Sequence, residues 1–353
     1  MKTDAKTQGR IAWIDALKGF SMIAVVLSHS SLGRHIPYFY FVTRCYMATF
    51  YFLSGYTYHE KADGFSSYCN KRAKRLLIPY AVYGVALVAL DSTVLFLKGS
   101  SLKTIIFQKW GGLIYGRYML CYALDSSTGG LVHFMVSWNS SLWFLTSMFV
   151  SSLLFYGLAH LSSKRRLLAI LLCFASSAAF IYCPVLLPWS LDTVPLTALI
   201  MLSGFYFKKL NLDEMSLVHK ISFLIPVAVV YLICVKFGDG INLSIRIYGS
   251  RGLVSFAWAL SQLFVGSVCF TLFFSMIPPI RLLFPFAFIG RHSITYLCTH
   301  FFVLFIAGRL FSCFALPEIT SAVLCFLFVL AAGAMISLIF DKLKERITIV
   351  KYL

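Results

Sequence analysis

Long apolar segments alternate with short polar segments along nearly the whole chain. A helix needs about 20 apolar residues to cross a bilayer, and about ten segments reach this length. They cover approximately residues 11–31, 38–58, 76–97, 140–160, 167–183, 190–207, 221–236, 253–276, 291–312 and 319–340. The pattern predicts an all-α fold, a polytopic integral membrane bundle of about ten transmembrane helices that forms one domain over residues 1–353.

Composition and charge agree with this prediction. Hydrophobic residues make up 59% of the chain and charged residues 12%, which is about half the charged fraction of a soluble domain. The 31 Lys and Arg outnumber the 13 Asp and Glu, and the basic clusters fall in alternate connecting segments. The positive-inside rule therefore predicts cytoplasmic termini and contacts between the basic loops and membrane lipids. No basic domain stands apart from the apolar segments, which argues against nucleic-acid binding.

Polar side chains interrupt the first apolar segment, where they are costly. Eleven helical residues from Lys18 to His29 turn three full turns plus about 20°, so both side chains share one face, about 16 Å apart along the axis. Asp15 lies within about 60° of both. Asp15 and Lys18 could form an i,i+3 ion pair. His29 has no such local partner, and it is either a hydrogen-bonded core residue or a general base, since imidazole titrates near neutral pH.

Basic residues and a second histidine mark two other helix starts. Arg72 and Arg75 precede the third apolar segment at i,i+3 spacing, where they could grip phosphates or serve as ordinary cytoplasmic anchors. Arg291 begins the ninth segment and is equally an anchor or a functional residue. His300 follows about 13 Å deeper in the same predicted helix, which makes it a second candidate site residue.

The long segment 98–139 is rich in Tyr, Trp and Gly, and it contains His133. Together with Trp143 at the start of the fourth apolar segment, these aromatic side chains either lie in the membrane interface or form a platform for a sugar. The ten cysteines are scattered singly with no Cys-x-x-Cys pair. We therefore expect no metal site.

Five motifs in order resemble the membrane-bound acyltransferase-3 family. They are Asp15-Ala-Leu-Lys18-Gly with His29, Phe52-Leu-Ser-Gly-Tyr56, Arg72-Ala-Lys-Arg75 before Pro79, Leu142-Trp143-Phe-Leu145, and Gly290-Arg291-His-Ser293 followed by Tyr296 and His300. Each motif alone is weak, but their order over nearly the whole chain is specific. The sequence of residues 13–19 most resembles the branch of fucose and other sugar O-acetyltransferases.

The resemblance implies ten transmembrane helices in the bacterial inner membrane and transfer of an acetyl group from acetyl-CoA to a sugar hydroxyl. The acceptor would be a cell-surface polysaccharide or its lipid-linked precursor, with polysaccharide assembly enzymes as further partners. By position, Lys18 and His29 match the family's basic residue and histidine, and Arg72 and Arg75 match its arginine pair. Here the basic residue is Lys18, a point charge without the bidentate fork of arginine.

These motifs lead to a set of expected roles. We expect His29 and Asp15 to be catalytic, with Asp15 orienting or balancing Lys18. The expected acetyl-CoA ligands are Lys18, Arg72, Arg75 and Arg291, and the expected acceptor ligands are Trp143, His133 and His300.

Two other classes of protein stay open at this point. One is a transporter or flippase of a lipid-linked sugar or small anion, which ten spans with buried charges also suit. The other is a scaffold of a polysaccharide assembly complex. Succinyl transfer is a further option, for which Arg44 or Arg309 could receive the extra carboxylate.

Overall fold

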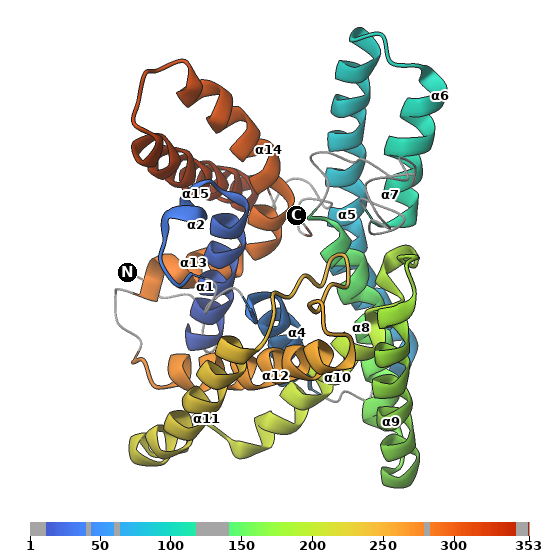
Figure 1. Ribbon diagram of the computed structural model, residues 1–353, viewed down its shortest axis with the longest axis vertical. Coiled ribbons are helices and arrows are strands. Elements are labelled where there is room, and N and C mark those ends of the chain that lie inside the picture. Colours follow the sequence, from blue (N-terminus) through green and yellow to red (C-terminus); the bar gives the residue numbers. More distant parts are fainter. Residues whose placement is uncertain are drawn as a thin grey trace.

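The computed structural model describes residues 12–39, 44–59, 64–117, 141–278, 283–343 and 352, and these residues form helices joined by short connections (Figure 1). No strand occurs among them. The α-helices are α1 (Ala12–His29), α2 (Leu32–His35), α4 (Tyr46–Tyr56), α5 (Gly64–Leu97), α6 (Leu102–Ile105), α7 (Gly111–Tyr115), α8 (Trp143–His160), α9 (Ser163–Ala179), α10 (Val194–Phe207), α11 (Leu217–Phe237), α12 (Leu253–Ser275), α13 (Phe284–Arg291), α14 (Ser293–Ser312) and α15 (Glu318–Leu343). The predicted all-α class is confirmed.

Nine helices within the described part of the chain are long and apolar enough to cross a membrane. They correspond to nine of the predicted spans. The remaining one, residues 38–58, contains α4, which has 11 residues and is therefore only about 16 Å long. That is roughly half of a bilayer core of about 30 Å. The structure thus corrects the second predicted span to a short helix within the bundle.

The third predicted span is also longer than the pattern suggested. Helix α5 begins at Gly64 and continues for 34 residues through Pro79, which is about 51 Å. Arg72 and Arg75 precede the apolar part of this helix but lie within it, one turn apart on the same face.

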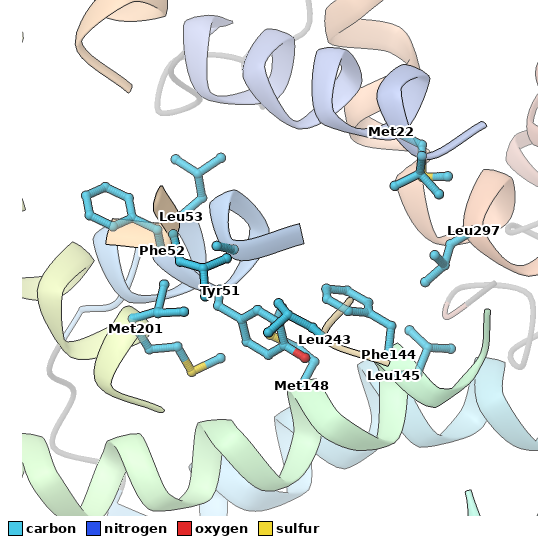
Figure 2. Close-up of a cluster of buried hydrophobic side chains, with 14 of the residues drawn as sticks. Met22, Tyr51, Phe52, Leu53, Phe144, Leu145, Met148, Met201, Leu243 and Leu297 are labelled. Carbon is cyan, nitrogen blue, oxygen red and sulfur yellow. The ribbon is translucent and has the colours of Figure 1, made fainter. Parts of the chain in front are cut away.

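Helix α4 lies at the centre of the bundle, beside α1, α8, α10 and α12 (Figure 1). None of its residues is exposed. Figure 2 shows the Tyr51 side chain of α4 extending towards α8, near Met148, whereas Phe52 and Leu53 point away from α8. The Tyr51 hydroxyl donates a hydrogen bond of 2.8 Å to Ser147 Oγ, which satisfies two buried polar groups in the core.

The peripheral helices have the opposite character. Helices α9, α11 and α15 bury few of their residues. Their exposed side chains are large and apolar, for example Leu171, Ile225 and Leu338. Because lipid tails are as apolar as these side chains, such faces are stable against a membrane and not against water.

Two pairs of glycines bring helix backbones into direct contact. A Cβ on Gly19 of α1 would lie 1.8 Å from the Phe286 carbonyl oxygen, and one on Gly290 of α13 would lie 1.8 Å from the Asp15 carbonyl oxygen. Gly55 of α4 and Gly204 of α10 meet in the same reciprocal way. Small residues allow this close approach between membrane helices, and it fixes the position of the central helices.

Candidate functional site

A polar cavity of about 490 Å³ lies beside the central helices, at the C-terminal end of α1, and is called here the histidine cavity. Its walls come from α1, the start of α4, the start of α8, the connection between α11 and α12, and α14. The polar residues that line it are Ser28, His29, Arg44, Tyr46, Ser141, Trp143, Asn242 and Ser244. A cavity of this size and polarity can hold a sugar unit through hydrogen bonds and an aromatic wall.

His29 is the last residue of α1, and its side chain is exposed to this cavity. Its ring centroid lies 4.4 Å from that of Phe301 and 5.4 Å from that of His300, both of α14. The imidazole therefore packs against two rings of α14 and also lines the cavity. Among the described residues, no cluster of His, Cys, Asp or Glu could hold a metal ion.

His300 lies behind His29 and is fully buried. Its Nδ1 is 3.0 Å from both the Tyr296 and the Leu297 carbonyl oxygens. Carbonyl oxygens only accept hydrogen bonds, so Nδ1 carries the proton and Nε2 has the lone pair in the neutral ring. Nε2 is buried and makes no hydrogen bond within the described residues. His300 Nε2 is thus a hydrogen-bond acceptor without a partner in the described part of the chain, and leaving it unsatisfied costs stability.

A second, smaller cavity of about 110 Å³ lies along the middle of α1. It is called the cationic cavity, because its charged lining residues are Lys18, Arg72 and Arg75. Most of its other walls are apolar side chains of α1, α4, α8 and α14. Lys18 Nζ is 3.7 Å from Asp15 Oδ1, which confirms the i,i+3 ion pair. The Arg72 guanidinium carbon is 5.3 Å from the centre of the Tyr68 ring.

The two cavities meet at Met47 and Leu297, which line both of them. In the other direction, Thr57, Arg72 and Arg75 also line a third cavity of about 360 Å³, called the basic cleft. This cleft adds Lys71 to the positive groups. A continuous series of cavities therefore runs from the basic cleft through the cationic cavity to His29.

A buried ion cluster positions one wall of the histidine cavity. Asp192 accepts hydrogen bonds from Arg117 and from Arg246 Nη1, the latter at 2.7 Å. Arg117 also donates to the Ser244 carbonyl. Burial lowers the pKa of Arg117, and the Asp192 carboxylate opposes this shift. Because buried charges are tolerated only when paired and hydrogen-bonded, this cluster ties three loops together and holds Asn242 at the cavity.

The structure brings together most, but not all, of the residues expected from the sequence. Lys18, Arg72 and Arg75 converge on one cavity, and His29 and Trp143 line another. His133 lies outside the described residues.

Asp15 pairs with Lys18, as expected of a residue that orients or balances the lysine. It is about 21 Å from His29 along the axis of α1 and does not line the histidine cavity. Two expectations differ from the observed geometry. Arg291 is exposed beside Phe284 and does not line the cationic cavity. The reason is that α13 ends at this residue and His292 interrupts the helical backbone before α14 begins. His300 supports His29 from behind rather than lining the cavity.

Sequence reasoning gave no role to Tyr46, Asn242 or Ser244, which complete the histidine cavity. Asn242 Oδ1 accepts hydrogen bonds from Ser244 N and Oγ, at 3.0 and 2.6 Å. A turn of this kind has no distinctive sequence signal, so only the fold shows that Asn242 and Ser244 line the histidine cavity.

Comparison with known proteins gives one result. A family model described as an acyltransferase domain matches residues 11–340, which is nearly the whole chain. A search of curated proteins and a search of solved structures each returned no match.

Proposed function

This chain belongs to the acyltransferase-3 family, and from that premise we propose that it is an O-acetyltransferase of the bacterial inner membrane. It would move an acetyl group from acetyl-CoA to a sugar hydroxyl of a cell-surface polysaccharide or its lipid-linked precursor. The observation that carries the proposal is the pair of adjoining cavities, one with three cations and one with His29, which share Met47 and Leu297.

The donor would enter through the basic cleft. The phosphates of CoA are anions, and arginine binds phosphate through two parallel hydrogen bonds. Arg72 and Arg75 line both the cleft and the cationic cavity, so they can hold phosphates at the boundary between the two. Lys18 lies nearer the reaction centre as a point charge whose position Asp15 fixes. The narrow apolar part of the cationic cavity suits the uncharged arm that carries the thioester.

His29 would act as the general base on the acceptor. Its imidazole takes the proton of the sugar hydroxyl, whose oxygen forms a bond to the acetyl carbonyl carbon. The carbon–sulfur bond then breaks, and the departing thiolate takes the proton from the His29 imidazolium. Atoms and charge balance without a metal or redox partner. Transfer takes place where the two cavities meet, which is the boundary that Met47 and Leu297 form.

His300 would act as a positioning residue in this scheme. Its Nε2 can accept a hydrogen bond, because its Nδ1 proton is held by the two backbone carbonyls. An acceptor 5.4 Å away, measured between ring centroids, favours one orientation of the His29 ring and of its proton.

The test is acetyl transfer by the full chain in membranes that contain the native glycan. Acetyl-CoA labelled in the acetyl group is added, and the label is traced in polysaccharide and lipid-linked sugar. Wild type should transfer label and release CoA, and His29→Ala should do neither. His219→Ala is the matched control, since His219 is exposed and lines neither cavity.

Two results would contradict the proposal. Full activity of His29→Ala would remove His29 from the chemistry. Movement of a sugar across the membrane with no thioester cleavage would instead support a transporter.

A further inference from the structure

A fourth cavity adjoins the histidine cavity and shares no lining residue with the cationic cavity. It has a volume of about 520 Å³ and is called here the arginine vestibule, because Arg34 and Arg44 line it. It shares Ser28, Arg44, Tyr46 and Ile241 with the histidine cavity. Arg44 therefore stands on the boundary between the vestibule and the space that contains His29.

The described lining of these two cavities is positive. It includes Arg34 and Arg44, and no Asp or Glu. The nearby acids on the same segments are engaged elsewhere. Glu318 faces His35 at 3.4 Å. The carboxylate of Asp239, directly before Gly240, accepts hydrogen bonds from Ser255 and Arg251.

Asn242 supplies a further donor at this boundary. Its Oδ1 accepts hydrogen bonds from Ser244 N and Oγ, so its NH₂ group is the part that can donate to a ligand. The Tyr46 hydroxyl is engaged within the protein, because Ser28 donates its proton to the Val25 carbonyl and Tyr46 donates to Ser28 Oγ at 3.3 Å. A guanidinium beside an amide donor is a common composition of a carboxylate or phosphate site.

From this arrangement we infer that the acceptor carries an anionic group, a carboxylate or a phosphate, that binds Arg44 while the reacting hydroxyl lies at His29. The inference rests on the proposed function and deepens it. The vestibule and the cationic cavity share no lining residue, so the CoA phosphates lie away from the vestibule, and we assign the anion to the acceptor. The acceptor class is therefore an acidic sugar, such as a uronic acid, or a sugar esterified with phosphate.

Direct binding tests the inference without requiring catalysis. The full chain is placed in nanodiscs of zwitterionic lipid and titrated with methyl glucuronide, glucose 1-phosphate and methyl glucoside, with calorimetry as the readout. At least one of the two anionic sugars should bind about tenfold tighter than the neutral glucoside, because a charge-assisted bidentate contact contributes that much. Arg44→Gln should remove this preference and leave glucoside binding unchanged, and Arg44→Lys should retain part of it.

Arg309→Gln is the matched control. Arg309 is an exposed arginine of α14 that lines none of the three cavities, so its replacement should leave the preference intact. A preference only for glucuronide assigns a carboxylate, and one only for glucose 1-phosphate assigns a phosphate.

Equal binding of the three sugars would overturn the inference. So would an Arg44→Gln variant that keeps the preference, or one that weakens all three sugars alike, as loss of a structural anchor would. The same preparation is assayed for CoA release from acetyl-CoA. A binding preference without CoA release would reject the proposed function and keep the anion site. CoA release and transfer without the preference would do the reverse.

Discussion

The histidine cavity and the cationic cavity adjoin the same helix but differ in size and in the residues that line them. The first is wide, about 490 Å³, and its polar lining comes largely from helix ends and a loop. The second is narrow, about 110 Å³, and its three cations stand among apolar side chains from the middle of helices. Few strong charges in an apolar surrounding suit a phosphate-bearing group of fixed shape. Many neutral hydrogen-bonding groups suit a polar ligand that differs from one protein to the next.

This difference separates two kinds of specificity along α1. Variants at the Lys18 end should change the use of acetyl-CoA, and variants at the His29 end should change the chemistry or the choice of acceptor. The following experiments measure kcat and the KM for acetyl-CoA and for the acceptor. An effect of a variant at one end on the KM of the other substrate would therefore be detected.

His29→Ala should have the largest effect. Loss of a general base costs about 10²–10⁴-fold in rate, so kcat should fall to this extent while the KM for acetyl-CoA changes by less than about twofold. The measurement is steady-state transfer with purified protein and an excess of acceptor. A large rise in that KM would show that His29 also holds the donor, which would erase the contrast between the cavities.

Arg75→Ala should come next, and it should act on the donor. Removing one charge-assisted contact to phosphate weakens binding by about tenfold or more, so the KM for acetyl-CoA should rise while the KM for the acceptor stays constant. Lys74→Ala is the control, since Lys74 is an exposed neighbour that lines neither the cationic cavity nor the basic cleft. An equal effect of both variants would indicate general surface charge instead of a site.

His300 offers a test of positioning by two amide replacements. His300→Asn keeps a donor near the place of Nδ1, and His300→Gln keeps an acceptor near the place of Nε2. If Nε2 orients His29, Asn should lower kcat by about tenfold and Gln by less, with both KM values unchanged. The shape of the pH–rate profile should change in the same order. The reverse order would assign His300 a purely structural role through its backbone contacts.

Gly19→Ala should have the smallest effect on rate and a clear effect on stability. The added Cβ would meet the Phe286 carbonyl oxygen at 1.8 Å, so α1 and α13 must separate, at a cost of about 1–3 kcal/mol. Thermal unfolding in detergent would report this as a lower Tm. Gly308→Ala is the control, because its Cβ would meet nothing within 4 Å. Since Gly19 follows Lys18, the KM for acetyl-CoA should shift by a few-fold, and that for the acceptor should not.

Much of the fold follows from the sequence, because membrane spans are set by length and apolarity alone. The shared face of Lys18 and His29 follows equally from helix geometry. The convergence of Lys18 with Arg72 and Arg75 does not, since spacing within one helix says nothing about the neighbour it packs against. The reciprocal glycine contacts join α1 to α13 and α4 to α10, and they explain why Gly55 and Gly290 occur in the motifs.

The remaining differences have local causes. Arg291 shares its motif with Gly290, but α13 ends at that residue, and only Gly290 and Ser293 of this segment reach the cationic cavity. The short length of α4 is hidden because apolar residues on both sides extend the hydropathy signal beyond the helix. The Arg117–Asp192–Arg246 cluster joins loops far apart in sequence, which no periodic pattern can predict.

The apolar boundary at Met47 and Leu297 has a consequence for the energetics of the whole cell. Water-filled cavities that open to both sides of a membrane must not be joined by a continuous chain of water molecules. Such a chain would conduct protons and dissipate the electrochemical gradient. A thioether and an isobutyl group offer water no hydrogen bonds, and apolar constrictions in channels empty of water and block ions. In the proposed reaction, only a two-carbon unit has to pass this point. That reaction would let an acetyl group through while the membrane stays electrically tight.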